Sequence, residues 1–145
     1  MNGLKLGLGS IMLIAFLLGS NNVLSGELIW ETTRKAAYLK AVSEKKKILL
    51  FGGRGSCGNC RYMRDKVFEA MKPPIKTILE KNFVIWAADV DRSREWYPYV
   101  RGMKEFDLPI ICVIDPNKNN IYEDRTTGRQ DIPDFYSRLL LYVER

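Results

Sequence analysis

Short apolar runs alternate with amphipathic stretches along most of the chain. Consecutive apolar residues predict strands that are covered on both faces at residues 48–51, 83–90 and 109–114. After a turn rich in Asp, Asn and Pro, a further strand is predicted to pair back at residues 121–127. Helical composition is found at residues 34–46, 61–70, 75–81, 93–106 and 131–143. This alternation predicts an α/β fold with a central sheet covered by helices on both faces.

Two of the predicted helices depend on particular residues. In the helix over 34–46, Ala36, Leu39, Ala41 and Val42 are available for the buried face. In the helix over 93–106, Pro98 must start, kink or split the helix, because proline has no backbone N–H to donate.

Residues 1–25 predict an export signal. Lys5 supplies positive charge, the apolar run 6–18 follows, and small residues up to Ser25 form a cleavage site. The run is shorter than the ~20 residues that span a membrane. We expect cleavage after Ser25, which leaves residues 26–145 as one domain; an uncleaved amino-terminal anchor is the alternative. The domain is therefore expected to be periplasmic or secreted.

Composition and charge exclude several function classes. The 145 residues suffice for one domain. Because histidine is absent, Ser-His-Asp and Cys-His catalysis, His-ligated zinc hydrolysis and c-type haem attachment are ruled out. The formal net charge is +6, but basic residues are interleaved with acids, as in Glu44-Lys45-Lys46-Lys47. We expect a solvated basic surface and no binding of nucleic acid.

The chemistry of the chain rests on two of its three cysteines. Cys57-Gly58-Asn59-Cys60 follows a predicted strand and begins a predicted helix, so both sulfurs can meet on the first helical turn. At the helix amino terminus Cys57 faces unpaired backbone N–H groups, which favour its thiolate. Cys60 lies deeper and can resolve a mixed disulfide by attacking Cys57. The pattern favours reversible disulfide exchange, with no dissociable cofactor.

Other uses of the pair stay open. A carrier of a soft metal such as Cu(I) needs only two thiolates. A structural zinc site needs four ligands, and the only further cysteine is Cys112, so zinc could be held only with the help of carboxylates or across a dimer; we expect no metal site. The pair could also be an inert disulfide, or belong to a non-catalytic interaction module. Cys112 lies in an apolar run and is expected to be a small buried hydrophobe.

The sequence around the pair resembles the thioredoxin-like family. The apolar strand before the pair, Cys57-Gly58-Asn59-Cys60 itself and the later Leu108-Pro109-Ile110-Ile111 carry this resemblance, which extends from about Trp30 to Val143. Further segments are similar to its exported branch, which includes periplasmic thiol:disulfide interchange proteins: Trp30, Lys47-Ile48-Leu49-Leu50, Arg61-Tyr62-Met63, Val67-Phe68 and Phe83-Val84. The resemblance implies a three-layer sandwich, with a mixed β-sheet of about four strands flanked by helices.

The resemblance also implies roles for four residues. Cys57 would be the nucleophile and Cys60 the resolving thiol. Pro109 would be a cis-proline that faces the disulfide, and the backbone of Leu108 would pair with an extended substrate.

The chain departs from thioredoxins at the positions that surround the pair. Ser56 and Asn59 stand where thioredoxins carry Trp and Pro, while Phe51 and Ala87 stand where they carry a buried acid and its lysine. The proton of Cys60 would therefore be exchanged with water, substrate or another group. Asp89, at the end of a predicted strand with Asp91, is expected to form a turn there, with a proton relay as the alternative.

Three arginines surround the pair in the sequence, at Arg54, Arg61 and Arg64. Any of them within ~4–6 Å of Cys57 would favour its thiolate. A stabilised thiolate makes the disulfide a stronger oxidant. The alternative is that all three are solvated surface groups, so the sequence leaves the direction of electron flow open.

Together these features predict an exported thiol:disulfide oxidoreductase. We expect a monomer that exchanges disulfides with other exported proteins and is recycled by a membrane-bound redox partner.

Overall fold

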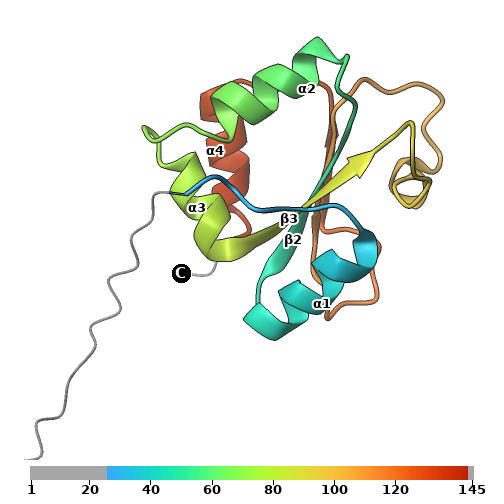
Figure 1. The fold of residues 1–145 in the computed structure, drawn as a ribbon, viewed down its shortest axis with the longest axis horizontal. Coiled ribbons are helices and arrows are strands. Elements are labelled where there is room, and N and C mark those ends of the chain that lie inside the picture. The colour runs from blue at the N-terminus through green and yellow to red at the C-terminus, as the bar shows by residue number, and fades with distance from the viewer. Residues whose placement is uncertain (1–25, 144–145) are drawn as a thin grey trace, which may run out of the picture.

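The computed structural model describes residues 26–143 (Figure 1). The predicted export signal, residues 1–25, lies outside this described part, so its cleavage stays a prediction. Within residues 26–143, no helix combines the length and apolar character needed to cross a bilayer.

The described residues form five strands and four α-helices in the order β1 (Trp30–Glu31), α1 (Arg34–Glu44), β2 (Lys47–Gly53), α2 (Gly58–Tyr62), α3 (Ile75–Asn82), β3 (Phe83–Asp89), β4 (Ile110–Ile114), β5 (Asp124–Thr127) and α4 (Ile132–Leu140). A π-helical turn, Met63–Val67, continues α2, and a 3₁₀ turn, Tyr97–Val100, lies between β3 and β4.

The strands form one mixed sheet in the order β1-β3-β2-β4-β5. β1 and β2 lie parallel to β3, whereas β4 is antiparallel to both β2 and β5. The predicted fold class is confirmed, with one more strand than expected. The extra strand is β1, whose two residues are too few to show the alternation that identifies a strand in a sequence.

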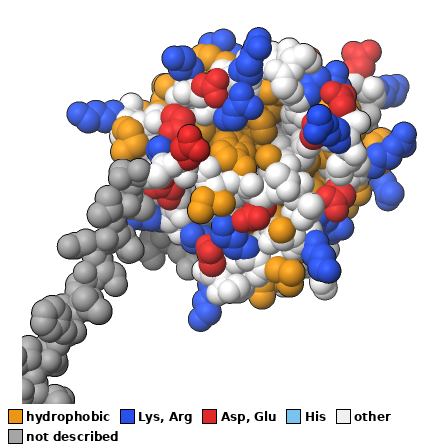
Figure 2. Space-filling model, in the orientation of Figure 1, with side chains coloured by type: hydrophobic (Ala, Val, Ile, Leu, Met, Phe, Trp, Pro, Cys, Tyr) orange, Lys and Arg blue, Asp and Glu red, His pale blue; other side chains and the backbone are white. Residues whose placement is uncertain are grey.

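Two apolar clusters fill the space between the sheet and its helices. Successive residues of β2 point to opposite faces: Ile48 and Leu50 join the cluster beneath α1, while Leu49 and Phe51 join the cluster beneath α2, α3 and α4. Figure 1 shows these three helices on one side of the sheet and α1 on the other. This is the predicted three-layer arrangement. On the face shown in Figure 2, basic and acidic side chains are interleaved around a central apolar area.

The prediction of a helix over residues 93–106 is wrong. Only the 3₁₀ turn Tyr97–Val100 forms there. Pro98 cannot donate a helical hydrogen bond, and Gly102, at φ 88°, turns the chain out of the helical region.

The predicted buried face of α1 is also wrong at two positions. Leu39 and Val42 are 64% and 54% exposed. Ala41 is fully buried as predicted, together with Ala37, which was not predicted. Small alanine side chains allow the helix backbone to lie close to the sheet, which places the larger residues on the outer side.

Candidate active site at the carboxyl end of β2

The cysteine pair follows directly from the end of β2. After Gly53 the chain turns, with the Cys57 N–H donating to the Arg54 carbonyl at 3.2 Å. Cys57 is the cap residue of α2, and its Sγ accepts the Cys60 N–H at 3.1 Å. The predicted position of Cys57 at the start of a helix, with Cys60 on the first turn, is what the structure shows.

Cys57 and Cys60 are joined by a disulfide, with their Cα atoms 5.2 Å apart. The two residues differ in exposure: Cys57 is half-buried, whereas Cys60 is 1% exposed and belongs to the cluster beneath α2. A partner sulfur can therefore approach Cys57 but not Cys60. This difference suits a pair in which the outer cysteine reacts with a partner and the inner one reacts with its neighbour.

Leu108 and Pro109 lie at the same end of the sheet. Gly52 of β2 pairs with Ile110, the first residue of β4. Pro109, which precedes β4, and the cysteine turn, which follows β2, therefore lie at the same end of the sheet. The Leu108–Pro109 peptide bond is cis, as the resemblance implies. The Gly128 N–H donates to the Pro109 carbonyl at 2.9 Å and to the Asp107 carbonyl at 3.1 Å, which fixes this segment against the loop after β5.

A hollow of about 400 Å³ opens beside Cys60, and we call it the Cys60 hollow. Its lining comes from β1–α1, β2, α2, β3 and the segment after β3, and comprises Thr32, Phe51, Gly53, Arg54, Gly55, Cys60, Arg64, Ala87, Ala88, Asp89, Arg92 and Ser93. Gly53 makes the closest approach: a Cβ at this residue would lie 2.9 Å from Cys60 Sγ. A side chain here would therefore collide with the sulfur.

Two of the three predicted arginines line the Cys60 hollow. Arg54 pairs with Asp91 at 3.1 Å, and Arg64 pairs with Asp65 at 3.0 Å. Arg61 is exposed on α2. Arg54 and Arg64 thus lie on the side of Cys60, and the effect of the arginines on the Cys57 thiolate stays a prediction.

Cys112 is fully buried in β4, as predicted. Burial raises the pKa of its thiol from 9.0 to about 12, a shift that the nearby Arg125 opposes. It therefore stays protonated and unreactive at neutral pH. In the part of the chain that the structure describes, no three His, Cys, Asp or Glu side chains are grouped so as to hold a metal ion.

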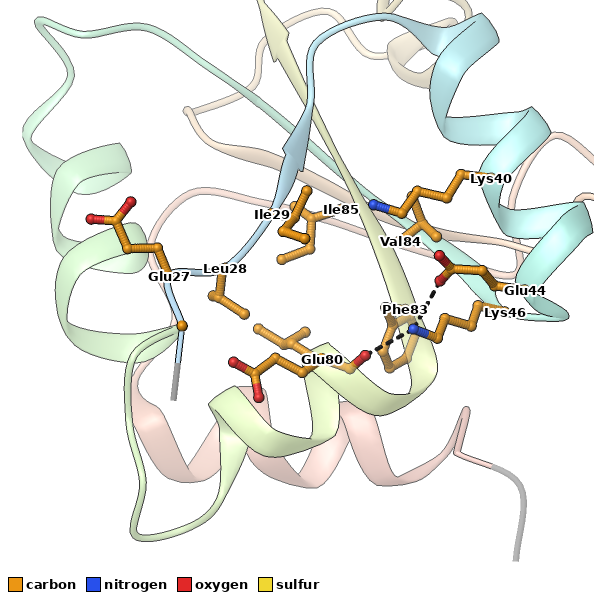
Figure 3. A pocket seen from close by; sticks show the side chains of 12 residues that line it. Glu27, Leu28, Ile29, Lys40, Glu44, Lys46, Glu80, Phe83, Val84 and Ile85 are labelled. Atoms are coloured by element: carbon orange, nitrogen blue, oxygen red, sulfur yellow. Dashed lines mark hydrogen bonds and ion pairs between the residues drawn. The ribbon is translucent and has the colours of Figure 1, made fainter. Parts of the chain in front are cut away.

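A second hollow, of about 250 Å³, lies at the amino end of β3 (Figure 3). Leu28, Phe83 and Ile85 contribute to its apolar lining. Lys46 Nζ donates to the Glu80 carbonyl at 2.9 Å and pairs with Glu44, also at 2.9 Å. We call it the Lys46 hollow; no cysteine lines it.

Three residues that contribute contacts in this region were not predicted from the sequence. Gly53 makes room for the Cys60 sulfur, and Gly128, at φ 82°, holds Pro109. The Arg129 guanidinium lies 3.4 Å from the centre of the Tyr62 ring on α2. The sequence does show two consecutive glycines where the strand before the cysteine pair ends, which could have pointed to Gly53. The contacts of Gly128 and Arg129 join segments that are distant in the sequence, so no local pattern predicts them.

Comparisons with known proteins agree with this geometry. A family profile described as thioredoxin-like matches residues 29–116, more than half of the chain. No match is found among curated proteins.

Solved thioredoxins share the fold. A thioredoxin from Thermus thermophilus is 19% identical with a TM-score of 0.65, over 80% of this chain and 87% of that chain. Poplar thioredoxin h (PtTrxh4) is 15% identical with a TM-score of 0.57, over 80% and 96%. The Drosophila melanogaster germline thioredoxin Deadhead is 17% identical with a TM-score of 0.58, over 79% and 99%. With its sheet order, its Cys57–Cys60 disulfide and this family match, the chain belongs to the thioredoxin-like family.

Proposed function

We propose that this protein is an exported thiol:disulfide oxidoreductase that exchanges disulfides with other exported proteins through Cys57 and Cys60. The observation that carries the proposal is the unequal burial of the two linked sulfurs at the end of β2. An inert disulfide between residues three positions apart would constrain the unfolded chain very little.

In the reducing direction, the Cys57 thiolate attacks a substrate disulfide. A bond forms between Cys57 Sγ and one substrate sulfur, and the other substrate sulfur leaves as a thiolate. Cys60 then attacks Cys57 Sγ, which forms the intramolecular disulfide and releases the second substrate sulfur. In the oxidising direction the same steps run in reverse, beginning with attack of a substrate thiolate on Cys57. The cysteine pair itself carries the two electrons.

The substrate would lie extended along Leu108, whose backbone pairs with it next to the disulfide. The fixed position of this segment supports that role, because Gly128 holds the Pro109 carbonyl. A redox partner must recycle the pair after each turnover, and we propose a membrane protein for this step. The export signal predicted over residues 1–25 supports the location; amino-terminal sequencing of the protein recovered from a cell envelope fraction tests it.

The Cys60→Ser variant tests the exchange. Without the resolving thiol, the mixed disulfide between Cys57 and its substrate should persist. When the reduced variant is incubated with a peptide disulfide, the Cys57 thiolate should displace one peptide thiolate, and the variant should gain the mass of one peptide. Dithiothreitol should release it. The double variant Cys57→Ser with Cys60→Ser is the control and should gain nothing. Absence of the adduct in the single variant would overturn the proposal.

A further inference from the structure

We propose that Asp89 exchanges the proton of the Cys60 thiol, through water held in the Cys60 hollow. The inference rests on the proposed function, because only a resolving thiol has to lose a proton in every cycle. Cys60 must become a thiolate before it can attack Cys57 Sγ. The new sulfur–sulfur bond then replaces the bond from Cys57 to the substrate, and that electron pair leaves on the substrate sulfur.

The interior of the protein offers no acceptor for this proton. Cys60 is 1% exposed and packs in the apolar cluster with Phe51 and Met63. Among the described residues, no polar or charged residue is buried. The proton must therefore leave on the side of the hollow, which Cys60 itself lines.

Gly53 keeps that path open. A side chain at this position would begin 2.9 Å from Cys60 Sγ and 3.2 Å from a carbon of the Phe51 ring. With glycine there, no side chain of this residue stands between the sulfur and the hollow, and both Gly53 and Cys60 line the hollow. A hollow of about 400 Å³ has room for several water molecules.

Asp89 is the group of the hollow that can accept a proton. In the register of the parallel strands, Asp89 of β3 lies directly beside Gly53 of β2. The other charged groups that line the hollow are Arg54 from the cysteine turn, Arg64 from the turn after α2 and Arg92 from the segment after β3. Arginine does not give up its proton in proteins. Among the described residues that form the lining, Asp89 is the one carboxylate.

The Asp89 carboxylate is also held in place. Its Oδ1 accepts the Asp91 N–H at 2.9 Å, and its Oδ2 lies 3.5 Å from Arg92 Nε. The side chain remains 44% exposed, so a proton taken from the hollow can pass on to solvent. Asp89 therefore acts on the Cys60 proton through water and does not contact the sulfur itself.

The test separates the two steps of exchange. Reduced protein reacts with dithiobis(nitrobenzoate), and each step releases one coloured thionitrobenzoate. The first phase reports attack by Cys57 and the second reports attack by Cys60 on the mixed disulfide. In Asp89→Asn we expect the second phase to slow about tenfold at pH 7. This effect is smaller than the loss expected for a general base in direct contact with the reacting group, because Asp89 acts through water. Near pH 9 the two proteins should match, because hydroxide then removes the proton.

The sign of the change distinguishes this role from simple electrostatics. Loss of a negative charge near Cys60 would by itself favour the thiolate and speed the second phase. An unchanged or faster second phase at pH 7 would therefore overturn the inference. Asp91→Asn is the matched control: it removes the same charge from a carboxylate that pairs with Arg54 but does not itself line the hollow, and it should not slow the second phase. Equal slowing in both variants would also refute a specific role for Asp89.

The first phase keeps the two proposals apart. If the first phase is present and Asp89→Asn leaves the second unaltered, only the role of Asp89 is lost. If the wild-type protein shows no first phase that depends on Cys57, the proposed function itself fails.

Discussion

A hollow lies at each end of strand β3: the Lys46 hollow at its amino end and the Cys60 hollow at its carboxyl end. The two hollows differ in what their charged side chains contact. At the amino end, Lys46 is bonded to the Glu80 carbonyl and to Glu44 over an apolar lining. At the carboxyl end, Asp89 and three arginines line a hollow beside the Cys60 sulfur, which lies so close to Gly53 that no side chain fits there.

The comparison teaches that a hollow alone does not identify a site. Polar groups at the amino end are used to join α1, β2 and α3, so their removal should cost stability and leave exchange unaffected. At the carboxyl end, Gly53 lies against the buried sulfur of Cys60, which the proposed function makes the resolving thiol. Changes there should alter exchange more than stability.

The largest effect is expected from Cys57→Ser. Because Cys57 is the sulfur that a partner can reach, this variant should lose disulfide exchange down to the uncatalysed rate. Reduction of a peptide disulfide, followed by chromatography, measures this. The contrast is Cys112→Ser, in which both active-site sulfurs remain. Exchange in the folded fraction of that variant should match the wild type, and a comparable loss there would place Cys112 in the reaction.

A smaller loss is expected from Gly53→Ala. The added Cβ would lie 2.9 Å from Cys60 Sγ, so the sulfur must move by several tenths of an ångström. Misplacement of a reacting atom by about 1 Å costs up to about a hundredfold, so we expect the resolving step to slow by tenfold to a hundredfold. The matched control is Gly55→Ala, where a Cβ would meet nothing within 4 Å. Similar rates in both variants would show that the space beside Cys60 is not needed.

Much of the fold and the cysteine pair could be predicted because their signals are local. The buried strands β2, β3 and β4 are continuous apolar runs, and the cysteine pair lies between a strand and a helix in the sequence itself. β1 could not be predicted, since its two residues owe their extended form to pairing with Ile85 and Trp86 of β3.

The Cys60 hollow also could not be predicted from the sequence. It exists because Gly53 of β2, Asp89 of β3 and Arg64 after α2 come together, and only the sheet register sets Asp89 beside Gly53. Asp89 does form the expected turn, through its bond to the Asp91 N–H. The predicted buried face of α1 is confirmed at Ala41 but fails at Leu39, because the sheet packs against the small side chains of Ala37 and Ala41 and leaves the larger Leu39 outside.

Alkaline pH should destabilise the protein through Cys112, on the face of the sheet away from the active site. Its pKa is raised to about 12 in the folded state, above its ordinary value of 9.0. The contribution of the protonated thiol to the stability of the folded state is complete below the pKa of the unfolded state, 9.0, and is lost as pH rises toward 12. Between pH 8 and pH 10.5 we expect a loss of about 2 kcal/mol, measured by urea unfolding. Cys112→Ala should lose less over this range; an equal loss would contradict a buried, protonated thiol.

The smallest effect is expected at the amino end of β3. Lys46→Met removes the bond to the Glu80 carbonyl and the pair with Glu44, so the free energy of unfolding should fall by about 1 kcal/mol. Urea unfolding measures this, with exposed Lys35→Met as a control that should change little. Exchange through Cys57 should be the same in both variants. A loss of exchange in Lys46→Met would break the contrast between the two hollows.

The most direct test of the central claim is the equilibrium of the Cys57–Cys60 pair with glutathione or dithiothreitol buffers, measured by alkylation and mass spectrometry. We predict a single two-electron transition in which both cysteines become alkylated together, while Cys112 stays unmodified in the folded protein. A potential near roughly −270 mV would indicate a reductant and one near roughly −120 mV an oxidant. A pair that stays oxidised below about −300 mV, as structural disulfides do, would contradict the account.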